Sequence, residues 1–275
     1  MKLRRPGRVR PARRAATDSL RRGIFLLPTS FTVGNMLCGF AAIIAALHGR
    51  VLFAGWLIIL AAVLDGLDGR IARLTNSASE FGKEYDSLAD VVSFGVAPAI
   101  LAYQWGLRGL GRWGWAAAFL FLVAGSVRLA RFNVKAHTGD RRFFTGLAIP
   151  AGAGAPTVLV LIHPEPVLDR SLAVGLWGFV LIVSLLMVST VPYRSFKDFN
   201  WRQRWPATTF FLLALIAVAL AVFREEAMAV LLAVYILSGP LEWLVRTVRR
   251  TPVSAGGHDG EPRGGGNAGG DPHHS

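Results

Sequence analysis

The chain has 275 residues, of which 53% are hydrophobic, and it carries a formal net charge of +13. A sequence this apolar and this basic is not an ordinary soluble domain. Its long apolar runs, separated by short basic loops, indicate a polytopic helical membrane protein. Cys38 is the single cysteine, so a disulfide framework and a cysteine-ligated metal site within this sequence are both excluded.

The first 22 residues contain nine Lys or Arg and few residues that could form a core. We interpret residues 1–27 as a basic cytoplasmic arm without regular structure that contacts anionic membrane lipids, with a short interfacial helix at 20–27 before Pro28. A nucleic-acid-binding tail would interleave aromatic residues with the basic ones, and this arm does not. We therefore expect no nucleic acid among its partners.

Eight apolar stretches are candidates for membrane spans between residues 28 and 250, which we treat as one transmembrane domain. They are 31–47, 51–74, 87–105, 113–134, 148–163, 171–191, 206–222 and 227–246. The apolar part of the second, 51–64, is too short to cross alone, because a crossing takes about 20 residues. That helix must continue through DGLDGRIARL, which places Asp65 and Asp68 near one membrane face.

Two further segments, at 151–155 and 251–275, are distinctive in composition. The run AGAGA at 151–155 predicts close packing between helices rather than a phosphate-binding loop. Residues 251–275 are rich in Gly, Pro and His without apolar periodicity, and we expect them to be disordered.

The distribution of positive charge predicts the orientation. With the N-terminus inside, 25 of the 30 Lys and Arg fall on the cytoplasmic side. The other five are Arg50, Arg108, Arg112, Arg170 and Arg224. Basic residues favour the cytoplasmic side of a bacterial inner membrane. We therefore expect both termini, and the segment that carries Asp65 and Asp68, to face the cytoplasm.

Four aspartates, Asp65, Asp68, Asp86 and Asp90, lie in or beside these apolar segments. An ionisable group at such depth costs several kcal/mol, as a rough figure, unless something compensates it. The i,i+3 and i,i+4 spacings place each pair on one helix face. The polar loop at 75–85 would let the two helices run antiparallel, so both pairs can converge. Oxygen ligands of this kind suit hard divalent cations, and two such ions could clamp a pyrophosphate.

The neighbouring residues suit a nucleotide. Gly69 and Ala72 place small side chains on the face of Asp65, which leaves room for a ligand. Arg73 offers a planar fork for phosphate. Buried carboxylates also occur in structural acidic patches and along the ion paths of transporters. The spacing alone leaves both a metal–phosphate enzyme and a cation transporter open.

The pattern Asp65-x-x-Asp68-Gly69-x-x-Ala72-Arg73, eight residues, Gly82-x-x-x-Asp86-x-x-x-Asp90 resembles the full signature of the CDP-alcohol phosphatidyltransferases. The resemblance implies an all-α membrane protein with a six-helix core and, here, two further C-terminal helices. It implies that Asp65, Asp68 and Asp86 bind two Mg²⁺ or Mn²⁺ ions, and that Asp90 is both general base and ligand of the second ion. It also implies that Gly69 and Arg73 contact the CDP-linked lipid and that Ser79 lies near the diphosphate.

Further stretches resemble the phosphatidylserine synthase branch of this family. They are DSLADVVSFGVAPA (86–99), RLARFN (128–133), GLAIPAGAG (146–154) and YRSFKDFN (193–200). Ala148 is a departure, because a proline is expected there. The branch implies transfer of the phosphatidyl group from CDP-diacylglycerol to the hydroxyl of L-serine, and a homodimer. In PTSFTVGN (28–35), Thr32 and Asn35 resemble a motif near the nucleotide, although Thr32 could equally cap a helix.

The predicted binding site for the acceptor alcohol is supported by fewer residues. Arg128 and Arg131 are i,i+3 at the cytoplasmic end of a predicted span and could meet the carboxylate of serine or a lipid phosphate, with Asn133 adding a hydrogen bond. The alternative is that both arginines are membrane anchors. Glycerol 3-phosphate or inositol phosphate as the acceptor would call for a denser basic pocket.

Overall fold

The computed structural model describes residues 12–75, 79–137, 144–193 and 222–249. These residues are nearly all helical, with one antiparallel pairing of two two-residue strands. The elements are α1 (Ala12–Leu47), α2 (Val51–Leu74), α3 (Glu80–Asp90), η1 (Val91–Val96), α4 (Ala97–Ala102), η2 (Tyr103–Leu107), η3 (Arg108–Leu110), α5 (Arg112–His137), β1 (Phe144–Thr145), α6 (Ile149–Ile162), α7 (Arg170–Val188), β2 (Pro192–Tyr193) and α9 (Arg224–Arg249).

Six of the described helical segments are long and apolar enough to cross a membrane, so the chain is a multi-pass membrane protein. They are Thr29–Leu47, Val51–Ala72, Glu80–Leu110, Arg112–Val134, Arg170–Val188 and Arg224–Val245. These six confirm the corresponding predicted spans. The predicted span at 148–163 is the shorter apolar helix α6, and the one at 206–222 lies outside the described residues.

Two predictions made from the sequence need correction. The predicted loop at 75–85 is shorter, because α3 already begins at Glu80 and continues through η1, α4 and η2 as one helical rod. At the N-terminus, α1 starts at Ala12 and runs through Pro28 without a break, where we predicted an irregular arm and a separate short helix. Residues 12–22 are rich in Ala and Arg, which favour helix, and Pro28 removes one helical hydrogen bond without ending α1.

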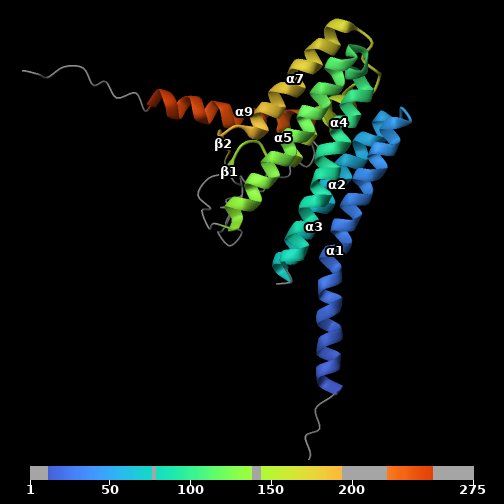
Figure 1. The fold of residues 1–275 in the computed structure, drawn as a ribbon, viewed down its shortest axis with the longest axis vertical. Coiled ribbons are helices and arrows are strands. Elements are labelled where there is room, and N and C mark those ends of the chain that lie inside the picture. Colours follow the sequence, from blue (N-terminus) through green and yellow to red (C-terminus); the bar gives the residue numbers. More distant parts are fainter. Residues whose placement is uncertain (1–11, 76–78, 138–143, 194–221, 250–275) are drawn as a thin grey trace, which may run out of the picture.

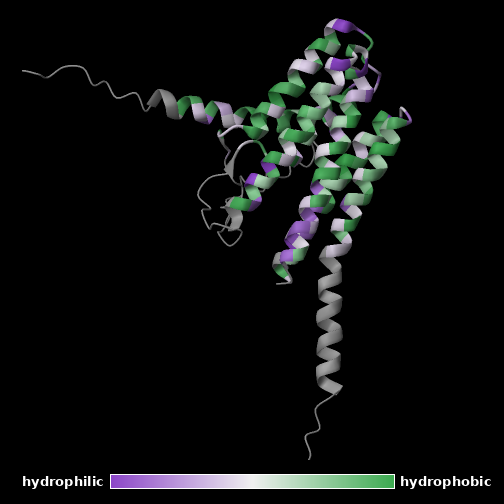
Figure 2. Ribbon diagram, in the orientation of Figure 1, coloured by the Kyte–Doolittle hydropathy of each residue, from purple (hydrophilic) through white to green (hydrophobic). Residues whose placement is uncertain are grey.

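The arrangement brings three helices together at one end of the molecule (Figure 1). The N-terminal part of α1, the end of α2 and the start of α3 lie toward the same end, while the α1–α2 turn and the start of α5 lie toward the other. Figure 2 shows apolar residues along the bundle and hydrophilic ones where α2 passes into α3. The acidic segment therefore sits at an end of the apolar region, as the sequence predicts.

Small residues let the helices approach closely. Buried alanines line the contact between α1 and α2, among them Ala42, Ala46 and Ala54. In the AGAGA run of α6, a Cβ on Gly152 would lie 2.6 Å from the Met187 sulfur of α7, and one on Gly154 would lie 3.1 Å from Leu232 of α9. Such contacts are typical of packed membrane helices. The close packing predicted for this run is confirmed.

A short loop before α6 fixes the end of α7. Gly146 has a φ of +84° and its N–H donates to the Val191 carbonyl over 2.9 Å. A Cβ at Gly146 would collide with the Met187 carbonyl oxygen. Ala148, where a proline was expected, has φ −61° and ψ 139°, the backbone conformation that proline itself adopts. The substitution at Ala148 therefore leaves the path of the chain unchanged.

Replacing Gly146 with Ala should destabilise the protein by more than about 2 kcal/mol, because the left-handed backbone and the collision with a carbonyl both penalise a Cβ. The measurement is the melting temperature in detergent. Gly175→Ala in α7 is the matched control, since a Cβ there meets no atom within 4 Å. Equal melting temperatures for the two variants would show that the loop does not need its glycine.

Candidate active site

Three carboxylates meet between α2 and α3. Asp65 and Asp68 project from α2 and Asp86 from α3, and one oxygen from each lies within 4.8 Å of the others. Asp68 is only 3% exposed. The antiparallel helices thus bring the two acidic pairs together, as the spacing predicts.

Asp90 joins the same cluster from the next turn of α3. Its carboxyl group interacts with that of Asp65, and the residue is 8% exposed. Among the described residues, the three aspartates with mutually close oxygens are the set that could hold a metal ion, and Asp90 borders it.

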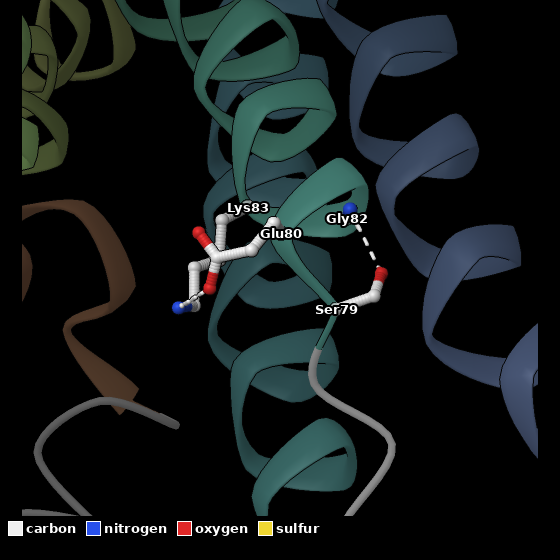
Figure 3. Close-up of polar contacts among 4 residues, drawn as sticks. All are labelled: Ser79, Glu80, Gly82 and Lys83. Carbon is white, nitrogen blue, oxygen red and sulfur yellow. Dashed lines mark hydrogen bonds and ion pairs between the residues drawn. The ribbon is translucent and has the colours of Figure 1, made fainter.

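Local signals set the turn that joins the two helices. Thr75 ends α2, where its hydroxyl donates to the Ile71 carbonyl over 2.8 Å. Ser79 begins α3 as its N-cap, and its Oγ accepts from the Gly82 N–H over 3.0 Å (Figure 3). Lys83 pairs with Glu80 on the exposed side of the same turn. The residue that we predicted near the diphosphate therefore has a capping role, while its contact with a ligand stays a prediction.

Helix α1 supplies polar contacts to two of the aspartates. The Thr32 hydroxyl donates to Asp68 Oδ2 over 2.9 Å, and the Asn35 amide donates to Asp90 Oδ1 over 3.5 Å. Both residues are buried. Thr32 therefore does not serve as a helix cap, because it lies well within α1. The structure brings both predicted residues to the cluster.

The electrostatics of the cluster call for a cation. Two unit charges 4.8 Å apart repel by about 3 kcal/mol even at an effective dielectric constant of about 20. One hydrogen bond to a charged group returns about 1.5–3 kcal/mol, which cannot offset three such pairs. None of the four aspartates forms a salt bridge among the described side chains. In addition, Asp86 Oδ1 is buried without a hydrogen-bond partner.

The donor set fits a hard divalent cation. All of the close ligand atoms are carboxylate oxygens, the donors that Mg²⁺ and Mn²⁺ accept, and the unpaired Asp86 oxygen is free to coordinate. Gly69 stands between Asp68 and Arg70 on α2. The Arg73 side chain lies outside the described part of the chain, so its predicted contact with phosphate stays a prediction.

A wide helical turn follows Asp90 directly. In η1 the Ala97 N–H bonds to the Val92 carbonyl, five residues back, just before Pro98, which has no N–H to donate. Such turns occur often at functional sites. This turn carries Ser93, which is fully buried and donates to the Asn35 carbonyl over 3.0 Å.

The three predicted acceptor residues on α5 behave differently. Arg131 donates to the Val188 carbonyl at the end of α7, and Asn133 donates to Ser87 over 2.8 Å. Both contacts tie helices together. Arg128 lies over the Phe132 ring, with 5.4 Å from Cζ to the ring centroid, and interacts electrostatically with Asp90. Of the three, Arg128 is the one whose charge reaches the cluster.

Two tyrosines near Arg128 were not predicted from the sequence. Tyr235 of α9 interacts electrostatically with Arg128, and its ring lies 5.6 Å from that of Tyr193. The Tyr193 hydroxyl donates to the Ile236 carbonyl, and burial raises the pKa of Tyr193 to about 12. The phenol therefore stays neutral. Tyr193 is the first residue of the YRSFKDFN stretch, and the family resemblance of that stretch could have pointed to it. Tyr235 lies in an apolar run, where no sequence pattern marks it.

Several known proteins are similar to this chain in sequence. The CDP-alcohol phosphatidyltransferase family model matches residues 25–241. A CDP-diacylglycerol–serine O-phosphatidyltransferase of Helicobacter pylori strain J99 is 38% identical over 228 residues, covering 82% of this chain and 94% of that protein. Proteins of the same name are 37% identical in Bacillus subtilis, over 62% of this chain and 91% of that protein, and 31% identical in Methanocaldococcus jannaschii, over 81% and 96%. The acidic site and the match over most of the sequence agree, and the chain belongs to the CDP-alcohol phosphatidyltransferase family.

Proposed function

We propose that the protein transfers the phosphatidyl group of CDP-diacylglycerol to the hydroxyl of L-serine, giving phosphatidylserine and CMP. The observation that carries the chemistry is the convergence of Asp65, Asp68 and Asp86 on one spot, with Asp90 beside them. The names of the relatives support serine as the acceptor.

The site would hold two divalent cations, Mg²⁺ or Mn²⁺. Asp65, Asp68 and Asp86 would be the ligands, and Asp90 would complete the second position. The unpaired oxygen of Asp86 and the uncompensated negative charge support this ligand set. Bound there, the ions would polarise the diphosphate and neutralise the charge that develops on the leaving CMP.

Asp90 is the residue that we assign as general base. Its carboxylate takes the proton from the serine hydroxyl, and the serine oxygen forms a bond to the phosphorus attached to diacylglycerol. The bond between that phosphorus and the oxygen of CMP breaks at the same centre. The burial of Asp90 keeps water away from the base, and its fixed position supplies most of the advantage.

The donor would lie along α1 and α2. Gly69, Arg73, Ser79 and Thr32 are the residues that we assign to the CDP-linked lipid. Asn35 was predicted with them, and it is the member of this set whose amide contacts Asp90. Thr32 contacts the cluster through Asp68, which supports a position beside the diphosphate that the metal ions would bind. An exposed apolar surface on the outer sides of the helices, including Leu37, Phe40 and Ile44, suits the acyl chains and surrounding lipid.

The acceptor would bind on the side of α5. Arg128 is the cation that we assign to the carboxylate of serine, because its charge reaches Asp90 and its guanidinium is held over Phe132. Arg131 and Asn133, on adjoining turns of α5, would line the same acceptor site. One arginine suits the carboxylate of serine, whereas the phosphate of glycerol 3-phosphate or inositol phosphate would call for a denser basic pocket.

The distribution of Lys and Arg supports an orientation in the cytoplasmic membrane with both termini and the aspartates inside, where CDP-lipids and serine are available. We further propose the division into an N-terminal arm (1–27), a transmembrane catalytic domain (28–250) and a tail (251–275). The homodimer implied by the family resemblance belongs to the same proposal.

A direct assay tests the acceptor. Purified protein with CDP-diacylglycerol and a divalent cation should release CMP when L-serine is supplied, and much less with glycerol 3-phosphate or inositol phosphate. Chromatography of the nucleotide and of the lipid product measures both. Faster CMP release with either phosphorylated alcohol would refute serine as the acceptor. Cation flux into liposomes without CMP release would instead support a transporter.

Replacing Asp90 with Asn should reduce turnover roughly 10²- to 10⁴-fold, the range that a positioned general base contributes. The shape of the side chain is kept, so the melting temperature should show a folded protein. Asp169→Asn is the control, since that residue is an exposed N-cap of α7 and asparagine caps equally well. Turnover retained in Asp90→Asn would remove this residue as the base.

Metal binding predicts a shift in stability. Saturating Mn²⁺ at 100 times its Kd should stabilise the folded protein by about 2.7 kcal/mol. Asp86→Asn should lose most of this shift, yet it should melt above the wild type in chelator, because one repelling charge is removed. Differential scanning fluorimetry in detergent measures both, with Asp169→Asn as control. The same Mn²⁺ shift in Asp86→Asn as in the wild type would exclude that aspartate as a ligand.

A further inference from the structure

Asn35 is held in an arrangement that does not favour stability. The residue is fully buried, yet its Oδ1 has no hydrogen-bond partner, and its Nδ2 makes a long bond of 3.5 Å to Asp90. A buried polar atom without a partner destabilises the folded state. The function of Asn35 must therefore lie in what its amide contacts.

The backbone at Asn35 is fixed to the element that follows Asp90. Ser93 of η1 donates its hydroxyl proton to the Asn35 carbonyl over 3.0 Å. Gly39, one turn further along α1, allows this approach, because a Cβ there would collide with Ser93. The same contact between α1 and η1 therefore fixes the amide of Asn35 and the carboxylate of Asp90 relative to each other.

We propose that Asn35 is a positioning residue for Asp90: its amide holds one carboxylate oxygen, which leaves the other for the proton of the acceptor hydroxyl. Ser93 holds Asn35 in place for this purpose. The inference rests on the proposed function, in which Asp90 is the base. It differs from a nucleotide-binding role for Asn35, because orientation of a base affects the rate of the chemical step, whereas a contact with the donor affects donor binding.

The test is Asn35→Leu in the full-length protein, assayed by CMP release over a range of serine and CDP-diacylglycerol concentrations. We expect kcat to fall about tenfold, part of the roughly 10²- to 10⁴-fold that a positioned base contributes. Both KM values should stay within about twofold of the wild type, because the Asn35 amide contacts Asp90, and a contact that orients the base leaves substrate binding unchanged. The melting temperature should show a folded protein, because leucine keeps the branched shape of the asparagine side chain.

Ser93→Ala is the second variant, and it keeps Asn35 itself. It should lower kcat by a smaller factor at unchanged KM, because it removes only the bond that holds the Asn35 backbone. Ser184→Ala is the matched control: that buried serine donates to the Val180 carbonyl within α7, away from the aspartates. Its kcat should equal that of the wild type. If Asn35→Leu does not fold, the comparison of Ser93→Ala with Ser184→Ala decides.

A raised KM for CDP-diacylglycerol with unchanged kcat in Asn35→Leu would overturn the proposal and assign Asn35 to the donor. Wild-type kcat in both Asn35→Leu and Ser93→Ala would overturn it as well. If serine is not the acceptor, the result differs, because wild-type protein would then release CMP with another alcohol and not with serine. The same variants compared with that alcohol would still support or overturn the positioning of Asp90.

Discussion

Repulsion among four carboxylates at the end of an apolar bundle is the constraint on which the rest of this structure depends. Asp65, Asp68 and Asp86 have oxygens within 4.8 Å of one another, and Asp90 adjoins them. Neither burial nor neighbouring charge favours four negative groups there. In the function that we propose, cations and a negatively charged substrate compensate this repulsion, which would link the stability of the fold to its ligands.

The surrounding helices hold the cluster from three sides. Helix α1 contributes Thr32 and Asn35, and the wide turn of η1 fixes Asn35 through Ser93. On α5, Asn133 ties its helix to Ser87, next to Asp86 of the cluster. The small residues of α1 and α6 allow these close approaches. Helix packing therefore holds the aspartates in position, and few hydrogen bonds are made to the aspartates themselves.

Helix α9 extends the site beyond the helices that carry the aspartates. Tyr235 reaches Arg128, and Tyr193 packs its ring against Gly239 and bonds to the Ile236 carbonyl. The β1–β2 pair places Tyr193 there, and Gly146 lets the chain turn into α6. A segment distant in the sequence therefore shapes the surroundings of the cation that we assign to serine.

The sequence by itself determined the helical membrane class, six of the eight predicted spans and the convergence of the acidic pairs, because apolar length and i,i+3 or i,i+4 spacing are local properties of a helix. It also determined the family, since the signature is fixed by spacing. The start of α3 at Glu80, the wide turn after Asp90 and the partners of Asn35, Arg131 and Tyr235 were decided only by the tertiary structure. Those features depend on which distant helices meet, and no local pattern encodes the atoms that a side chain contacts across such an interface.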